Sequence, residues 1–240
     1  MFGTLISRVC NRAHPMKHAI IVAVMICLIL LTRKSAIIPT ADNHFMRGQD
    51  VTFRVRDPTT GLESMCASDL AHTFRVEDLV GIAPFIRSAK NEQTGEGHRY
   101  YFRVIRVTAD TAFCFATELF LWAQRARPRP ADPFLTYRGN ALPAARWLDY
   151  KSLLVAIKLA AGYSGFDAKR FGSHSLRIGG ATNLAAAGHP NHYIQNMGRW
   201  KSLIFLQYIN LACKSMETAL HSLVNPTQFT NNQLRILNPI

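Results

Sequence analysis

The sequence predicts an α+β protein that is mainly helical and carries a small antiparallel sheet. Segments that alternate apolar and polar residues cluster between residues 50 and 107, whereas apolar residues at helical spacing dominate from residue 143 onward. Strands that cluster, rather than alternate with helices, are typical of α+β proteins. With 48% apolar residues in 240, the chain can bury a real core, and a largely disordered protein is excluded.

The first element is an unbroken apolar run, AIIVAVMICLILL, at residues 19–31. The run is shorter than the roughly 20 residues of an ordinary membrane span. Its length and basic lead fit a signal-peptide core, but no small-x-small cleavage pattern follows it. A buried helix is the other interpretation, and a loop with Pro39 and Asn43 is expected over 33–47.

The sheet is expected from three segments. Alternation predicts a strand at 50–55, and residues 79–89 and 99–107 are the second and third expected strands. A turn is expected at 57–61, and the polar, glycine-containing segment 90–97 suits a hairpin connection.

The remaining elements are predicted to be helical. The expected helices cover residues 109–125, 144–161, 173–187, 192–197 and 202–223. The first ends at the basic, proline-containing segment RPRP, and glycines or prolines separate the others.

Charge and cysteine usage narrow the function classes. The 28 Lys and Arg against 15 Asp and Glu give a net charge of +13, which indicates a polyanionic partner: nucleic acid first, an acidic membrane surface second. The five cysteines are dispersed, without CxxC or metal-ligand spacing, so no metal site is expected. Such thiols are typical of a reducing, nuclear or otherwise intracellular compartment.

The stretch 172–210, GSHSLRIGGATNLAAAGHPNHYIQNMGRWKSLIFLQYIN, carries the most chemical information. His174 and Arg177 are three residues apart on a predicted helix and share a face. Taken singly, His174 can be a helix-start residue, Trp200 a core aromatic and Tyr208 a tyrosine on an apolar helix. The informative feature is their order: HSLRIGGAT, AAAGHP, IQNMGRW and then a helix that holds Tyr208.

This order resembles the tyrosine recombinase family, the integrases that include the phage lambda, Cre and Xer enzymes. The chain looks closest to the eukaryotic mobile-element branch, the DIRS and crypton types. His174 and Arg177 match the histidine and arginine of the second box. Trp200, twenty-three residues after Arg177, matches the position that is His or Trp, and Tyr208 matches the nucleophile.

The resemblance reaches back to earlier segments and covers residues 18–223. Arg33, in LLTRKSAIIP, matches the first catalytic arginine, although Ala36 stands where the family usually has Glu. Lys90, in RSAKNEQTGEGHRYYF, matches the catalytic lysine of a β-hairpin. Alone, Arg33 can equally be a helix cap and Lys90 a solvated surface lysine.

The resemblance implies cleavage and rejoining of DNA through a 3′-phosphotyrosyl intermediate on Tyr208, with no metal and no other cofactor. Arg33, Arg177 and the indole N–H of Trp200 would bind the non-bridging phosphate oxygens. His174 would exchange a proton with the phenol, and Lys90 would protonate the leaving 5′ oxygen.

Further basic residues are candidates for contacts with the DNA backbone. They are Arg125, Arg127 and Arg129 in the proline-containing loop, and Lys169 and Arg170 before the His174 helix. Such contacts would be independent of DNA sequence and dependent on salt. A solvated charged face is the alternative.

The expected organisation is an N-terminal remnant or tail (1–17), a catalytic domain (18–223) and a C-terminal tail (224–240). Family members usually carry an N-terminal helical clamp, so a truncated chain, or a separate clamp domain, is expected. The expected partners are double-stranded DNA and further copies of the chain on that DNA, with no membrane. The alternatives are a weak or inactive DNA-binding remnant of a mobile element and a membrane-anchored basic protein.

Overall fold

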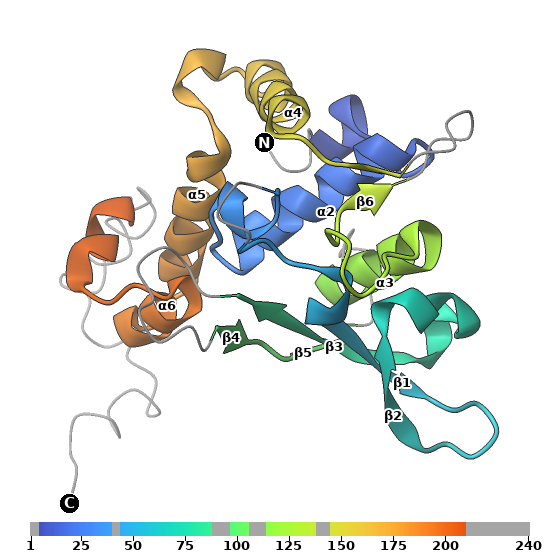
Figure 1. Cartoon of the computed structure of the whole chain (residues 1–240). Coiled ribbons are helices and arrows are strands. Elements are labelled where there is room, and N and C mark those ends of the chain that lie inside the picture. Colours follow the sequence, from blue (N-terminus) through green and yellow to red (C-terminus); the bar gives the residue numbers. More distant parts are fainter. Residues whose placement is uncertain (1–4, 40–43, 88–96, 106–113, 138–144, 210–240) are drawn as a thin grey trace, which may run out of the picture. The chain divides into compact units, whose positions relative to one another are not determined.

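The computed structural model is an α+β protein, about half helical, with a five-stranded antiparallel sheet and a two-stranded sheet (Figure 1). It describes residues 5–39, 44–87, 97–105, 114–137 and 145–209. The chain divides into two compact units, Met1–Arg177 and Ile178–Ile240, called here the first and second units. The α+β class with a small antiparallel sheet is therefore confirmed, whereas the recombinase fold and the division into tails and a catalytic domain stay predictions.

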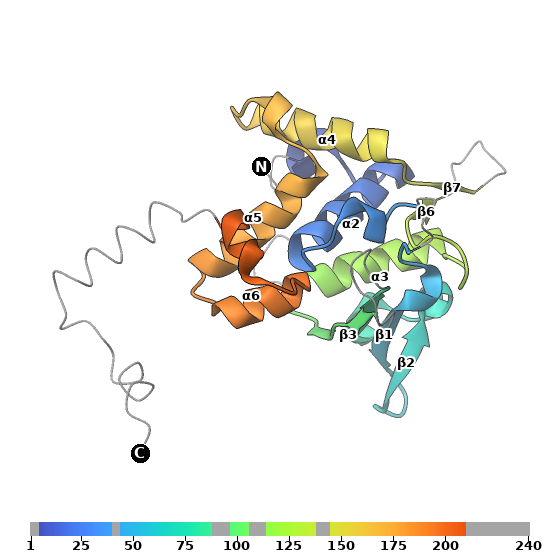
Figure 2. The same cartoon turned by 60° about the vertical axis from the view of Figure 1, so that its left-hand side comes forward.

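Helix α2 (Pro15–Ile29) is the central element of the first unit. Pro15 suits the first turn, where its missing N–H costs nothing. Every residue from His18 to Cys27 is buried, and Figure 2 shows the helix between α4 and α3. An interior position on all sides explains why the run is apolar without a polar face. In the described part of the chain, no helix is long and apolar enough to cross a bilayer.

The end of α2 redirects the chain. The N–H of Leu30 still donates to the carbonyl of Ile26, but Leu31 has a φ of 49°, a left-handed conformation that is strained for a leucine. Leu31 and Thr32 are fully buried, and this burial holds the turn. The expected loop follows, with a 3₁₀ turn at Lys34–Ala36; residues 40–43 lie outside the described part.

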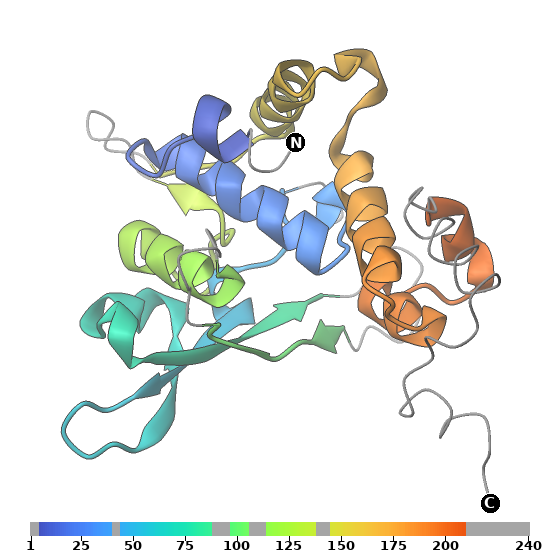
Figure 3. The same cartoon turned by 180° about the vertical axis from the view of Figure 1, so that it is seen from behind.

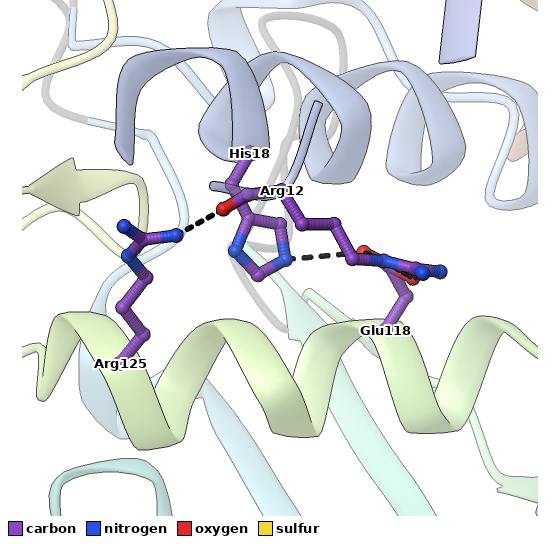
Figure 4. Close-up of polar contacts among 4 residues, drawn as sticks. All are labelled: Arg12, His18, Glu118 and Arg125. Carbon is purple, nitrogen blue, oxygen red and sulfur yellow. Dashed lines mark hydrogen bonds and ion pairs between the residues drawn. The ribbon is translucent and has the colours of Figure 1, made fainter. Parts of the chain in front are cut away.

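The segment before α2 packs against the same unit. The 5-residue π-helix η1 (Leu5–Val9) contacts α4, and both Leu5 and Cys10 are buried. Arg12 and His18 bind Glu118 of α3, while the guanidinium of Arg125 donates to the backbone carbonyl of Arg12 (Figure 4). These contacts fix the N-terminal segment to α3.

The five-stranded sheet has the order β2-β1-β3, with β4 and β5 both paired to β3. β1 (Val51–Arg56) and β3 (Leu79–Ile86) confirm two predicted strands, and the amide of Gly61 donates to Asp57 in the predicted turn. β2 (Glu63–Ala67) was not predicted, because this edge strand buries only one residue and lacks an apolar pattern.

The third predicted strand is interrupted. It consists of β4 (His98–Arg99) and β5 (Phe102–Arg103), which pair with β3 in one continuous register. Most of the predicted hairpin connection, 88–96, lies outside the described residues, as do 106 and 107.

Helix α3 (Phe115–Ala126) covers one face of this sheet (Figures 1 and 3). Phe120 packs edge-on against Phe53 of β1, with ring centroids 5.1 Å apart. The helix begins at Phe115, and 109–113 of the predicted range lie outside the described residues. Arg127, at φ 47°, ends the helix where the basic loop was expected to break it.

The predicted helix 144–161 begins later than expected. Arg146–Trp147 form β7, which pairs with β6 (Thr136–Tyr137), and α4 runs over Tyr150–Tyr163. Asp149 sets the start, because its carboxylate accepts a hydrogen bond of 2.8 Å from the amide of Ser152. The N-cap Asp149 therefore fixes the start of the helix at Tyr150, although the apolar spacing predicts a start at residue 144.

The remaining helices are partly as predicted. α5 (Ser173–Ala186) crosses the boundary between the units, and α6 (Asn191–Gly198) follows Gly188, whose φ is 82°. The predicted α-helix from 202 is wrong over its first turns: Leu203–Tyr208 form a 3₁₀ helix, η7. Three of its six residues, Ile204, Phe205 and Tyr208, are β-branched or aromatic and lower the helix propensity of the segment. Residues 210–223 lie outside the described part.

Candidate functional site

Three of the predicted catalytic residues lie close together in the first unit. The pKa of His174 is held below its usual range, first by burial and then by the positive charges of Arg177 and Arg33. Two guanidiniums can disfavour the imidazolium in this way only from nearby positions. Arg33 follows the end of α2 and Arg177 lies in α5, so the fold brings together residues that are far apart in the sequence.

Arg177 is the buried member of this group, with an exposed fraction of 6%. The last turns of α2 lie beside it, since its charge acts on the thiol of Cys27. Burial raises the pKa of Cys27 to about 12, although a hydrogen bond with Thr32 and the charge of Arg177 oppose the increase. A neutral thiol therefore lies near this guanidinium.

Arg33 is exposed, unlike Arg177. Its neighbour Lys34 lies over the ring of Tyr150, 3.4 Å from the centroid, and is engaged in a cation–π contact. Ala36 contributes backbone hydrogen bonds only: its amide donates to the carbonyl of Arg33 at 3.0 Å, and its carbonyl accepts from Met46 at 2.8 Å. Its methyl group cannot supply the carboxylate that the family pattern places there.

Trp200 lies in the second unit, and each residue of its GRW sequence has a defined place in the packing around the end of α6. Arg199, at φ 54°, ends α6 in a left-handed turn. The indole of Trp200 then stacks on Phe205, with centroids 5.5 Å apart and an interplanar angle of 29°, and Phe205 is fully buried. The ring also lies against Gly198, where any Cβ would overlap it.

Gly198→Ala is therefore expected to displace the indole. The added methyl group would collide with three ring carbons of Trp200, so the stack on Phe205 must open. Tryptophan fluorescence should shift to longer wavelength and quenching by acrylamide should increase. Gly162→Ala is the matched control, because a Cβ at Gly162 meets nothing within 4 Å. Equal spectra for both variants would contradict this packing.

The other two predicted catalytic residues are not placed. Tyr208 is the last residue of η7, and its side chain lies outside what the structure describes. Lys90 also lies outside the described residues.

Arg125 is already engaged within the first unit. Its guanidinium donates to the backbone carbonyls of Arg12 and, at 2.6 Å, of Ala13. These bonds hold the start of α2 on α3, so a structural role accompanies the predicted phosphate contact.

The other predicted DNA-contacting residues are all exposed: Arg127, Arg129, Lys169 and Arg170. The basic loop is anchored through its backbone, because the amides of Gly48 and Gln49 donate to the carbonyls of Asp132 and Pro130, both at 3.0 Å. Lys169 and Arg170 lie in the 3₁₀ turn η6 (Ala168–Arg170), which Asp167 caps. These four cationic side chains are available to an external anion.

Within the described ranges, no group of three or more His, Cys, Asp or Glu side chains could hold a metal ion. Four cysteines, Cys10, Cys27, Cys66 and Cys114, are free and buried. No protein-family model matches the chain, and the search of curated proteins found no match.

The sequence pattern does not mark Cys27 as a neighbour of Arg177, or Thr32 as a neighbour of Cys27. Both precede Arg33 closely, at the end of the apolar run, where a polar residue between Leu31 and Arg33 was a usable signal. The segment RYYFR was predicted only as a strand. Strand alternation places Arg99, Tyr101 and Arg103 on one face, which could have been predicted.

Proposed function

We propose that this chain is the catalytic domain of a tyrosine-type DNA recombinase, which cleaves and rejoins DNA through a phosphotyrosyl bond to Tyr208. One observation carries the proposal: Arg33 and Arg177 both act on His174 from separate elements. The family pattern predicts this grouping, and Arg33 joins it from a segment that lies far from α5 in the sequence.

Two guanidiniums suit the chemistry of a phosphodiester. The pentavalent transition state places additional negative charge on the non-bridging oxygens, and arginine binds such oxygens with paired hydrogen bonds at any working pH. Preorganised donors aimed at developing charge often supply the largest part of a rate enhancement. Arg33 and Arg177 have this role in the proposal, with the indole N–H of Trp200 as a third donor.

Protons move between three groups in the proposed reaction. The phenol oxygen of Tyr208 forms the bond to phosphorus and gives its proton to His174, whose lowered pKa favours the neutral imidazole that can accept it. The bond from phosphorus to the 5′ oxygen breaks, and Lys90 protonates that oxygen. The phosphotyrosyl bond retains the energy for rejoining, so the proposed reaction uses no metal or nucleotide cofactor.

The proposed substrate is double-stranded DNA. The net charge of +13 favours a polyanion, and the exposed cations of the 127–130 loop and of η6 are suited to phosphate contacts. Assembly of several copies on the DNA, and a clamp domain on another chain, belong to the same proposal.

A suicide substrate tests the proposal. Duplexes of randomised sequence, nicked so that the released 5′ end diffuses away, are incubated with the chain, and covalent adducts are detected by denaturing electrophoresis. We expect an adduct with the unaltered chain and its complete loss in Tyr208→Phe. Tyr163→Phe, at an exposed tyrosine of α4, is the matched control and should leave the adduct unchanged. An adduct that persists in Tyr208→Phe would remove the proposal.

A non-catalytic DNA-binding remnant is the second candidate, because Ala36 stands where the family supports its first arginine with Glu. The same experiment separates the two functions: salt-dependent duplex binding without any adduct is the remnant's signature. A membrane anchor is not proposed, because α2 is buried inside the first unit.

A further inference from the structure

The five-stranded sheet has a second face, opposite α3. In β1, Val51, Phe53 and Val55 are buried, whereas Arg54 and Arg56 are exposed. Directly paired residues of antiparallel strands lie on the same face. Met65 and Gly81 pair with Arg54, so both share its face.

This face is hollowed into a trough of about 470 Å³. Gly81 and Ala83 of β3, which are buried and have the smallest side chains of the lining, form its floor. Arg54 and Met65 stand on one side, and Tyr101 and Arg103 stand on the other. We call this feature the sheet trough; its volume lies within the range of about 300–1,000 Å³ typical of small-ligand clefts.

Cations and an aromatic ring alternate along one wall. The register pairs Arg99 with Phe85 and Arg103 with Gly81, which puts Arg99, Tyr101 and Arg103 on one face at intervals of about 6.8 Å. No other part of the described chain covers the ring of Tyr101, because this residue is 76% exposed. A ring with this exposure can stack on an external partner.

The sheet trough carries a surplus of positive charge. Glu63 is its acidic member, and it pairs with Arg54 at 2.7 Å and Arg56 at 2.9 Å. Its pKa is lowered chiefly by the hydrogen bond from Arg56, with the charge of Arg103 contributing. Three arginines thus surround one carboxylate, and about two positive charges remain for an external anion.

We infer that the sheet trough binds single-stranded DNA, with phosphates on Arg54 and Arg103 and a base stacked on Tyr101. A cationic groove combined with an exposed aromatic ring is the arrangement that recognises unpaired strands, because every base offers a π-face. The bases of a duplex already stack on one another, so duplex DNA leaves Tyr101 without a partner. An acidic peptide would use the arginines but not the ring. The inference does not depend on the proposed cleavage chemistry.

Binding of a fluorescein-labelled oligothymidylate, followed by polarisation, tests the inference. We expect Tyr101→Ala to weaken binding about fivefold or more, and Tyr101→Phe to bind normally. Arg54→Gln and Arg103→Gln should each reduce the slope of log K against log salt by about 0.7. The matched controls are Tyr163→Ala, at another exposed tyrosine, and Arg146→Gln, at another exposed arginine.

Three outcomes would overturn the inference that the sheet trough binds single-stranded DNA. These are unchanged oligothymidylate binding by Tyr101→Ala, an equal loss in Tyr163→Ala, and a Tyr101→Ala variant that changes only self-association. All the altered side chains are exposed, so the variants should fold, and circular dichroism verifies this. The suicide-substrate adduct, which requires Tyr208 and not Tyr101, should form in Tyr101→Ala. Failure of the inference is therefore distinguishable from failure of the proposed function.

Discussion

Arg177→Lys is expected to reduce the rate of covalent adduct formation by about a hundredfold or more. Lysine keeps the charge but loses the planar, bidentate fork that binds two phosphate oxygens. Removal of one preorganised donor from such a site typically costs about 10²–10³ in rate. The rate is measured with nicked duplexes under single-turnover conditions, so that DNA binding and chemistry are separated.

Arg177 is buried, so the substitution needs a test that is independent of folding. Arg33→Lys is this test, because Arg33 is exposed and its guanidinium is not needed for folding. We expect a comparable loss in the rate of adduct formation. Arg146→Lys, in β7, is the matched control and should keep the normal rate. Normal rates in both Arg177→Lys and Arg33→Lys, with thermal unfolding unchanged, would contradict the proposed site.

The sequence predicted the elements whose burial pattern is strong. α2 and β3 each leave an apolar run, and β1 leaves a strict alternation of apolar and polar residues. The elements it missed are fixed by contacts with other segments. β7 exists because Arg146 and Trp147 pair with β6, and the turns at 203–208 tighten where the indole of Trp200 meets Phe205.

The candidate site was predicted from a pattern of residue types, and the structure adds its physical basis in part. The charges of Arg177 and Arg33 both lower the pKa of His174, so these three residues lie near one another, and their catalytic roles stay predictions. Cys27 and the left-handed Leu31 could not be predicted from the pattern, because their roles depend on how α2 ends against α5. The places of Lys90 and of the Tyr208 side chain stay predictions.

The contacts of Glu118 lead to the largest expected effect on stability. This carboxylate is 2% exposed; it binds the guanidinium of Arg12 at 2.6 Å and Nε2 of His18 at 3.1 Å. Glu118→Gln leaves these two groups without their anion, and breaking a buried pair costs about 3 kcal/mol in the free energy of unfolding. Urea unfolding at pH 7 measures it. Glu63→Gln is the matched control, because its ion pairs with Arg54 and Arg56 are exposed and should contribute little to stability.

The dependence of this difference on pH has a defined sign. Burial raises the pKa of Glu118, but the hydrogen bonds and charges of His18 and Arg12 lower it by a larger amount. The net shift of this pKa is therefore downward. A carboxyl whose pKa is lower in the folded state stabilises the fold above its unfolded pKa of about 4.3, and this contribution is lost as the pH falls through the folded value. The gap between the unaltered chain and Glu118→Gln should therefore be full at pH 7 and shrink below about pH 4.3. A gap that widens with acid would mean that the charge of Glu118 does not hold the N-terminal segment on α3.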